Sequence, residues 1–245
     1  MMKDPATEAS QLNRVYAWFA ALVKEDAEGM DDLLAHGVPV DVPHPLRHTT
    51  ALMEATRLGR TAMVHWLLDR GATPAFLCGL PQGSPMHAAI RLHHWHIAAM
   101  LVDAAQSAGI TDHQGRTPLH MLALETIERT ISEPMLKLAG MITGKHCPID
   151  ALDREGLSAL HYAVINDHPP LTEVLLKLGA NPNIRVPDSG MTPLAVAALD
   201  KNTNLASLLI HYGANPYQHT RDGASPATIL PALSRMVAGV SSKPN

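Results

Sequence analysis

Polar and apolar positions recur in a fixed order along this chain. The pattern begins with Ser or Thr, continues with a small residue or Pro and an apolar residue, and reaches Ala five positions after its start. Four copies follow it: TALMEA at Thr50, SPMHAA at Ser84, SALHYA at Ser158 and TPLAVA at Thr192. Two others carry Leu at the Ala position: TPLHML at Thr117 and SPATIL at Ser225. The starts lie 34, 33, 41, 34 and 33 residues apart, and such regular intervals indicate a repeat architecture.

A second half-motif follows three of these starts at a constant offset. It reads WLLDRGATP from Trp66, VLLKLGANPN from Val174 and LLIHYGANPY from Leu208. Each repeat therefore predicts a short first helix, which Ser or Thr caps and which Pro can open. A Leu-rich second helix follows and ends where Gly71, Gly179 and Gly213 supply a left-handed residue. The small residue at the Ala position lets the next helix come close, and polar segments turn the chain into the next repeat.

These motifs resemble the ankyrin repeat family. The resemblance lies in TPLH at residues 117–120 and GANPN at 179–183, and it covers about residues 42–230. It implies an all-α fold, an ankyrin-repeat α-solenoid of stacked helix-turn-helix pairs with β-hairpin-like fingers at one edge. It also implies a structural role for His87, His120 and His161, which would bond to the backbone of neighbouring fingers. A buried polar group needs such a partner.

The two ends of the chain predict capping units, so we expect a single ankyrin-repeat domain over residues 1–245. Residues 1–41 form the N-terminal cap, with one helix over 8–24 and a partner helix over 26–35 that ends at Gly37. Five repeats fill residues 42–224. Residues 225–245 form a C-terminal cap and tail, where Pro231 interrupts the pattern.

The repeat that begins at Thr117 is longer than its neighbours. It is the fourth when the N-terminal cap is counted as the first, and its extra residues lie near 125–134, in ETIERTISEP. Repeat arrays accept insertions at loops, so a longer helix or a solvated loop is one interpretation. The other is a recognition element or an oligomer contact.

Composition narrows the function classes. The chain is 46% hydrophobic and only 4% aromatic, which suits helices packed closely through small side chains. A net charge of −4 argues against a nucleic-acid partner. No apolar run approaches about 18 residues, so no membrane span is expected. The N-terminus has no apolar segment of a secretory signal, and Cys78 and Cys147 form no Cys-x-x-Cys pair. We expect a cytoplasmic protein, or one delivered to a host cell by a signal-less route.

No catalytic signature stands out in the sequence. The nucleophile-elbow, phosphate-loop, zinc-protease and dinucleotide-binding motifs are missing. His146 and Cys147 are neighbours in KHCPID, but adjacent residues seldom align as base and nucleophile. We therefore predict a protein that is not an enzyme and needs no cofactor.

One stretch, RLHHWHI at 91–97, holds three histidines and a tryptophan. Counted from Ser84, His93 takes the place of Gly59 between two paired helices, and His94 takes the place of His168. Consecutive residues at a helix junction point in different directions, which makes a poor tetrahedral metal site. A structural turn is the first interpretation. A partner-contacting patch centred on Trp95 is the second, and a metal site is the third.

The resemblance places partner binding on the finger tips and on the concave face of the first helices. Seven and eight positions after each start, every repeat offers one large apolar side chain. The residues at these positions are Arg57 and Leu58, Arg91 and Leu92, Leu124 and Glu125, Ile165 and Asn166, and Leu199 and Asp200. Exposed in register, they would form an apolar stripe of the kind that partners cover. Periodicity alone leaves open whether they belong to a groove or to the core.

Charged finger positions suggest what the partner carries. Arg47, His113 and Arg116 join Arg57 and Arg91 to make the first half basic. The later fingers are mixed to acidic, with Arg154, Glu155, Asp188, Ser189, Arg221 and Asp222. We hypothesise a partner with an acidic segment and an apolar helix or strand. An ordinary solvated charge distribution is the alternative.

The leading hypothesis is a non-enzymatic, monomeric protein-interaction module. Its candidate roles are scaffold, inhibitor, bacterial effector or immunity protein. A metal- or redox-responsive protein that uses the histidine-rich turn and the cysteines is the alternative from another class. An enzyme would need a site that no spacing in this sequence supports.

Overall fold

The structure of the 245-residue chain, a computed structural model, describes residues 5–75, 83–125 and 133–234. Within these ranges the regular elements are helices, and no strand is present. The chain divides into two compact units, residues 1–113 (unit 1) and residues 114–245 (unit 2).

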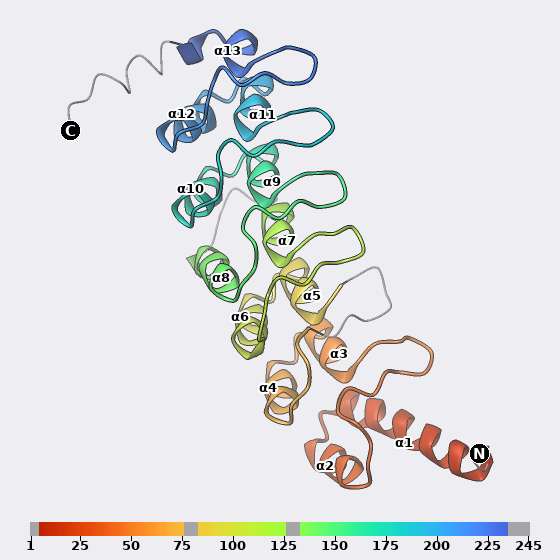
Figure 1. Ribbon diagram of the computed structural model, residues 1–245. Helices are drawn as coiled ribbons and strands as arrows, with labels where there is room; N and C mark the ends of the chain where they lie inside the picture. Colours follow the sequence, from red (N-terminus) through yellow and green to blue (C-terminus); the bar gives the residue numbers. More distant parts are fainter. Residues whose placement is uncertain (1–4, 76–82, 126–132, 235–245) are drawn as a thin grey trace. The chain divides into compact units, whose positions relative to one another are not determined.

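Unit 1 contains six helices in its described residues. They are α1 (Pro5–Lys24), α2 (Ala27–Ala35), α3 (Ala51–Arg57), α4 (Thr61–Asp69), α5 (Pro85–Arg91) and α6 (Trp95–Ala104). The first helices α3 and α5 pack on one another, as do the second helices α4 and α6, so each repeat contributes one helix to each layer (Figure 1). The long helix α1 packs against α2 and α3 and closes this end of the stack.

Unit 2 continues the same alternation. Its described helices are α7 (Pro118–Leu124), α8 (Glu133–Gly144), α9 (Ala159–Ile165), α10 (Pro169–Lys177), α11 (Pro193–Leu199), α12 (Thr203–His211) and α13 (Pro226–Ile229). Helices α7, α9, α11 and α13 form one layer, α8, α10 and α12 form the other, and the fingers extend from the first layer (Figure 1). The predicted all-α solenoid is confirmed.

Helix starts and ends follow the predicted chemistry. The side-chain oxygens of Thr50 and Thr192 accept hydrogen bonds from backbone N–H groups three residues on, at 3.3 and 3.1 Å. These N–H groups have no partner inside the helix, so the cap satisfies them. Gly71, Gly179 and Gly213 have φ of 83°, 98° and 88°, the left-handed conformation that ends α4, α10 and α12.

The core lies between the two layers of each unit. The residue five positions after each of the first five starts has no exposed surface, whereas Leu230, after the terminal start, is half-buried; the buried set is Ala55, Ala89, Leu122, Ala163 and Ala197. Four of the five are alanines, which allows close approach of successive first helices, such as α7 to α9 and α9 to α11. Leu122 is accommodated at the same position in the repeat that begins at Thr117.

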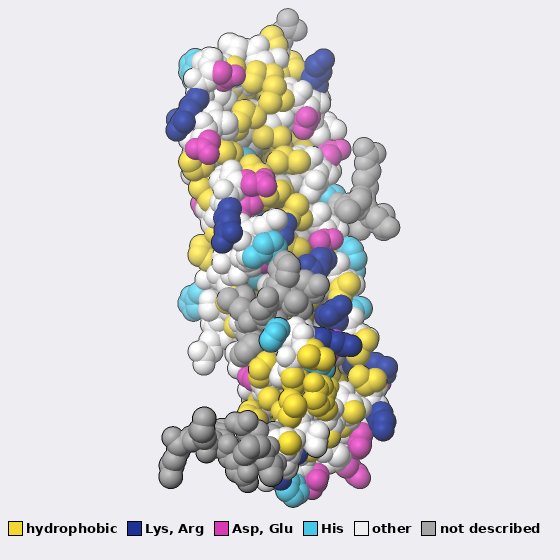
Figure 2. Space-filling view, turned by 90° about the vertical axis from the view of Figure 1, so that its right-hand side faces the viewer, with side chains coloured by type: hydrophobic (Ala, Val, Ile, Leu, Met, Phe, Trp, Pro, Cys, Tyr) yellow, Lys and Arg dark blue, Asp and Glu magenta, His cyan; other side chains and the backbone are white. Residues whose placement is uncertain are grey.

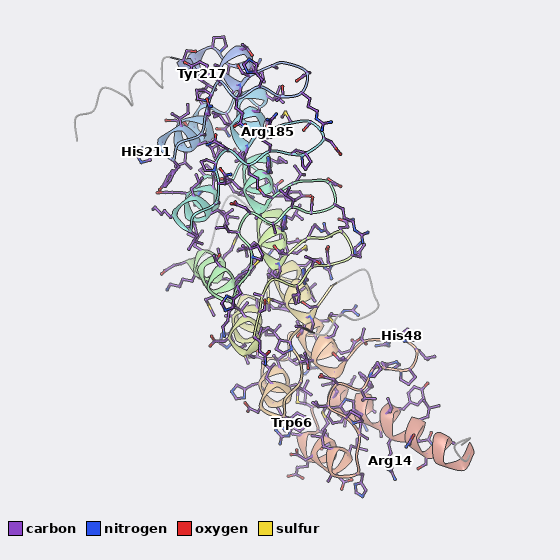
Figure 3. The ribbon with its side chains drawn as sticks, viewed as in Figure 1. Arg14, His48, Trp66, Arg185, His211 and Tyr217 are labelled. Carbon is purple, nitrogen blue, oxygen red and sulfur yellow. The ribbon has the colours of Figure 1, made fainter. Side chains whose placement is uncertain are left out.

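The fingers are hairpin-like turns that backbone hydrogen bonds close. In unit 2, the Asp153 N–H donates to the Leu157 carbonyl at 2.9 Å, and the Val186 N–H donates to the Met191 carbonyl at 2.9 Å. Neighbouring fingers are also joined, because the Arg221 N–H donates to the Ser189 carbonyl. A side-chain bond supports this link: Arg185 Nη2 donates to the His219 carbonyl at 3.0 Å (Figure 3).

Close contact between fingers explains one glycine. Gly156 has φ of 77°, and a Cβ added there would lie 2.6 Å from Cδ of Pro187 in the next finger. A side chain at this position would separate two fingers and strain the backbone as well.

The predicted role of the motif histidines is confirmed in unit 2. His120 Nδ1 accepts from the Thr117 N–H at 3.1 Å, and its Nε2 bonds to the Leu157 carbonyl at 3.0 Å. His161 repeats the arrangement with the Ser158 N–H and the Met191 carbonyl, at 3.2 and 3.4 Å. Because Nδ1 is the acceptor, Nε2 carries the proton and donates to the next finger.

Both helices of the N-terminal cap are anchored to α4. Trp18 of α1 is fully buried, and its ring centroid lies 6.2 Å from that of Trp66 on α4. Arg70 stacks over the Trp66 ring at 3.7 Å and donates two hydrogen bonds to the Asp31 carboxylate on α2. Within the cap, Arg14, which is labelled in Figure 3, donates from Nη1 to the His36 carbonyl and so ties α1 to the end of α2.

Some predictions of organisation stay open. Most of the insertion near 125–134 and all of 235–245 lie outside the described residues, so neither the insertion nor the tail is tested. The single-domain boundaries also stay a prediction, set beside the two compact units of the structure. No described helix combines the length and the apolar character needed to cross a membrane.

Candidate protein-binding surface

The apolar row consists of Leu58, Leu92, Leu124, Ile165 and Leu199, at the ends of the first helices. Sequence periodicity left open whether these residues belong to a groove or to the core. Leu58, Leu92, Ile165 and Leu199 have exposed fractions between 41% and 55%, and Leu124 is half-buried. The preceding turn of α9 is buried, with Leu160 at 0% and Val164 at 2%. In each unit the members of the row therefore lie at the surface, Leu58 and Leu92 in unit 1 and the other three in unit 2, and their role in binding stays a prediction.

Hydrogen bonds hold the backbone beneath the row in unit 2. Asn166, which follows Ile165, donates from Nδ2 to the Ala123 carbonyl at 2.9 Å and so ties the end of α9 to α7. One repeat further on, Asn202 Nδ2 donates to the Asp167 carboxylate at 2.6 Å. These cross-repeat bonds fix the spacing of the apolar side chains, which reduces the entropy lost when a partner binds.

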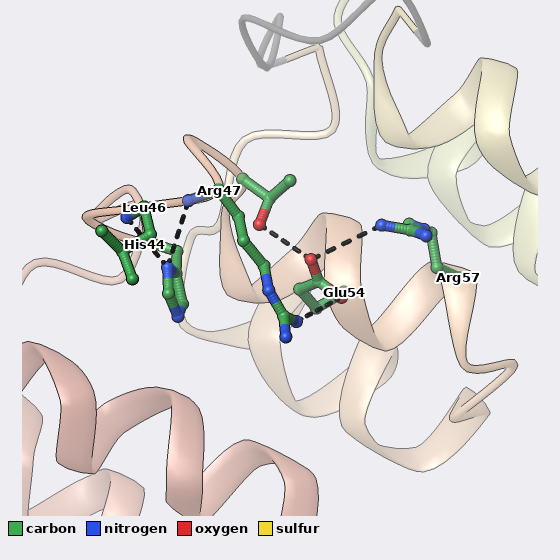
Figure 4. Close-up of polar contacts among 6 residues, drawn as sticks. His44, Leu46, Arg47, Glu54 and Arg57 are labelled. Atoms are coloured by element: carbon green, nitrogen blue, oxygen red, sulfur yellow. Dashed lines mark hydrogen bonds and ion pairs between the residues drawn. The ribbon is translucent and has the colours of Figure 1, made fainter.

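A basic cluster in unit 1 surrounds one buried carboxylate. The Glu54 side chain accepts a hydrogen bond from Thr49 Oγ1 at 2.8 Å and lies 4.0 Å from Arg47 Nη1 and 3.7 Å from Arg57 Nη1 (Figure 4). Glu54 is nearly buried, whereas Arg47 is exposed and Arg57 is partly exposed. One carboxylate thus orients two guanidinium groups and neutralises one of them, which leaves positive charge at the surface.

The other predicted finger residues are divided between the two units. Arg91, half-buried, ends α5 beside Leu92 in unit 1, where His113 is exposed. Arg116 is half-buried in unit 2. The later finger positions are exposed in unit 2, namely Arg154, Glu155, Asp188, Ser189, Arg221 and Asp222. Asp153, which the sequence did not single out, is buried and accepts hydrogen bonds from the Glu155 and Leu157 N–H groups.

A cavity of about 370 Å³ lies between α1 and the first finger of unit 1. Its lining residues are Tyr16, Phe19, Ala20, Leu22, Val23, His44, Arg47, Glu54, Leu58 and Arg60. Figure 2 shows hydrophobic side chains gathered on this face of unit 1. Sequence reasoning found Arg47 and Leu58 but missed α1. A signal was present: Leu12, Tyr16, Phe19 and Val23 recur at helical spacing beside the buried residues Trp18 and Leu22.

The histidine-rich stretch is a turn. His93 has φ of 57°, which corresponds to Gly59 with φ of 68° one repeat earlier, and His94 stands at the N-cap position of α6 without a side-chain cap bond. The His94 ring packs against Gly59, where an added Cβ would lie 3.1 Å away. Trp95 is half-buried and meets the His93 ring edge-on at 5.1 Å. Among the described residues, no group of three or more His, Cys, Asp or Glu side chains is placed to hold a metal ion.

Cys147 gives the redox alternative no support. Its side chain is buried and free, and burial raises the pKa of the thiol, which disfavours the reactive thiolate. Cys78 lies outside the described residues.

Comparisons with known proteins agree with this architecture. Residues 128–220 match the family model described as ankyrin repeats (3 copies). Neurogenic locus notch homolog protein 1 of Homo sapiens is 27% identical over 164 residues, which is 66% of this chain and 6% of that protein. NF-kappa-B inhibitor alpha of Sus scrofa is 32% identical over 112 residues, 43% of this chain and 33% of that protein. This chain thus spans only a small part of these relatives.

A solved structure shows the same fold. The ankyrin repeat domain of Bcl-3, described as a unique member of the IkappaB protein family, superposes with a TM-score of 0.73. The alignment covers 93% of this chain and 98% of that domain, at 22% sequence identity.

Proposed function

We propose that this chain, which has the fold of an ankyrin repeat domain, is a non-enzymatic module that binds another protein. The observation that carries the proposal is the apolar row. Each repeat places a large apolar side chain at the end of its first helix, and four of these five side chains are substantially exposed. Exposed apolar side chains that recur from repeat to repeat within a unit are typical of surfaces that a partner covers.

The partner we propose carries an apolar segment beside acidic side chains. Leu58, Leu92, Leu124, Ile165 and Leu199 would receive the apolar part. Arg47, Arg57 and Arg91 in unit 1 favour carboxylates near Leu58 and Leu92, because guanidinium groups pair with carboxylates through two hydrogen bonds. Trp95, His113 and Arg116 complete the proposed binding residues.

The role that we favour is inhibitor or scaffold, since exposed apolar side chains such as Ile165 and Leu199 suit contact with another protein. One relative is by name an inhibitor, NF-kappa-B inhibitor alpha, in agreement with such a role. A bacterial effector or immunity role, the monomeric state and a cytoplasmic or host-delivered location stay predictions.

Replacing two members of the apolar row tests the proposal. We expect Ile165→Asp combined with Leu199→Asp to weaken capture of the partner by about 100-fold, since each substitution removes an apolar contact and buries a charge. The partner would be identified by pull-down from source-cell and host-cell lysates, and its affinity measured by calorimetry.

Leu178→Asp is the matched control, because Leu178 is also exposed but ends α10 in the other layer. It should bind the partner with unchanged affinity. Unchanged binding by the double variant, with its melting temperature intact, would remove the apolar row from the proposed function.

Charge reversal tests the acidic part of the partner. Arg57→Glu with Arg91→Glu should slow association by about tenfold at low salt and reduce its dependence on ionic strength, since rim charges act mainly on the association rate. Arg221→Glu, an exposed finger arginine in unit 2, is the control. An association rate and salt dependence equal to those of the unaltered protein would show that the partner carries no acidic segment there.

A further inference from the structure

Helix α1 has two apolar faces, and only one of them is fully buried against the rest of unit 1. Trp18 and Leu22 are buried against the rest of unit 1. The second face consists of Leu12, Tyr16, Phe19 and Val23, which are spaced four, three and four residues apart and so lie in one row along the helix. Phe19 is buried, but Val23 is 62% exposed, and Leu12 and Tyr16 are also exposed. An amphipathic cap helix would normally present polar side chains there.

The first finger forms the opposite wall. The His44 ring lies edge-on to Phe19, with centroids 4.7 Å apart, and to Tyr16 at 5.9 Å. His44 Nδ1 accepts the N–H groups of Leu46 and Arg47 at 3.2 and 3.3 Å (Figure 4). These bonds bend the finger so that Leu46 is 76% exposed at its tip. The wall is therefore held in place by unit 1 itself.

Between these walls lies the cavity described above. We call it the α1 groove and define it by Tyr16, Phe19, Val23, His44 and Leu58. Its volume of about 370 Å³ falls within the range of about 300–1,000 Å³ that is usual for binding pockets. Leu58 belongs to the apolar row as well, so the groove continues the row toward the N-terminal cap.

Positive charge borders the groove. Arg47 and Arg60 line the cavity, and Arg57 follows on α3. Glu54 and Glu25 pair with these arginines, but the Glu54 carboxylate is nearly buried behind Arg47 and Arg57. Three guanidinium groups against two carboxylates leave an excess positive charge toward solvent.

We propose that the α1 groove binds an amphipathic α-helix of the partner, with apolar side chains on one face and carboxylates beside them. The proposal rests on the proposed function, that this chain binds a protein. A strand is disfavoured as occupant, because α1 uses its own backbone groups in helical hydrogen bonds and offers no free edge. The second apolar face of α1 runs over about 16 Å, the length of three turns of a partner helix. The carboxylates would meet Arg47 and Arg60.

A defined peptide tests this inference without knowledge of the partner. The probe is a fluorescein-labelled 18-residue helical peptide with Leu at spacings of four, three and four, flanked by Glu; its match carries Lys in place of every Glu. Fluorescence anisotropy with the full chain should show saturable binding of the Glu peptide, at least about tenfold tighter than that of the Lys peptide. Val23→Asp should lower the affinity for the Glu peptide by at least about tenfold.

Two further variants sharpen the result. Arg47→Ala should reduce the discrimination between the two peptides, because it removes a guanidinium from the border. Leu199→Asp, on the apolar row of unit 2 and outside the groove, should bind the Glu peptide as the unaltered chain does. Val23 and Arg47 are exposed, so neither substitution disturbs the core.

Three outcomes would overturn the inference. The first is that the Glu peptide shows no saturable binding. The second is that the unaltered chain binds the Lys peptide as tightly as the Glu peptide. The third is that Val23→Asp binds the Glu peptide as tightly as the unaltered chain does. Sedimentation velocity tests whether a second copy of the chain fills the groove instead. A dimer that Val23→Asp abolishes would show that it does. Peptide binding is measured without the partner. A negative peptide result would therefore contradict the groove proposal but not the proposal that the apolar row binds a partner. Failure of the Ile165 and Leu199 variants would likewise leave the groove result standing.

Discussion

Leu160→Ala is expected to lower the free energy of unfolding by about 3 kcal/mol, one of the two largest effects that the structure implies. Leu160 has no exposed surface and belongs to α9, which packs against both α7 and α11. Truncation to Ala removes buried methyl groups and leaves a cavity that neighbouring repeats, themselves tightly packed, fill only in part. Urea unfolding followed by circular dichroism at 222 nm measures the loss.

Ile165→Ala is the matched control on the same helix. Ile165 is 43% exposed, so its truncation should change the free energy of unfolding by less than about 0.5 kcal/mol. Equal losses for the two variants would mean that Ile165 belongs to the core and that the apolar row is no surface at all. The pair therefore separates core from surface in solution, without reference to any partner.

Sequence alone predicts the local geometry of this fold well. The caps at Thr50 and Thr192, the left-handed glycines such as Gly179, and the bonds of His120 and His161 are all confirmed. Each of these features depends on a few neighbouring residues and recurs at one offset. A periodic signal of this kind reports a repeated local environment, so one correct interpretation holds for every repeat.

The surface was harder to predict for a physical reason. Exposure depends on what packs above a residue, and periodicity carries no information on that. Leu160 and Ile165 are both apolar and share one helix, yet one is buried and the other exposed. The α1 groove was missed because one of its walls, which Tyr16, Phe19 and Val23 of α1 form, belongs to the N-terminal cap, outside the repeating motif.

The histidine-rich stretch shows that histidines close together in sequence need not form a chemical site. Three histidines within four positions suggest chemistry, but His93 occupies the left-handed position of a turn and His94 packs on Gly59 of the previous repeat. Their closeness in sequence follows from a helix junction. The histidines with a defined electrostatic role are instead those of the capping motif, which are separated along the chain and buried.

His161 makes the stability of unit 2 depend on pH. Burial lowers its pKa to about 4, only partly offset by its bond to the Met191 carbonyl, whereas an unfolded histidine titrates near 6.5. Above pH 6.5 the residue is neutral in both states and its stabilisation is fully present. As the pH falls from 6.5 toward 4, only the unfolded chain binds the proton, so about 3 kcal/mol of stability is lost.

His161→Asn tests this pH dependence directly. The Asn oxygen can still accept the Ser158 N–H, but it does not titrate and does not reach the Met191 carbonyl in the same way. The variant should be less stable at pH 7, and its deficit should shrink by about 3 kcal/mol between pH 7 and pH 4. Urea unfolding of both proteins across this range measures the difference. His219→Asn, which removes an imidazole from an exposed finger of the same unit, is the control. A deficit of His161→Asn that stays constant with pH would show that the imidazole protonates as readily in the folded protein as in the unfolded chain, and the buried capping role would then need revision.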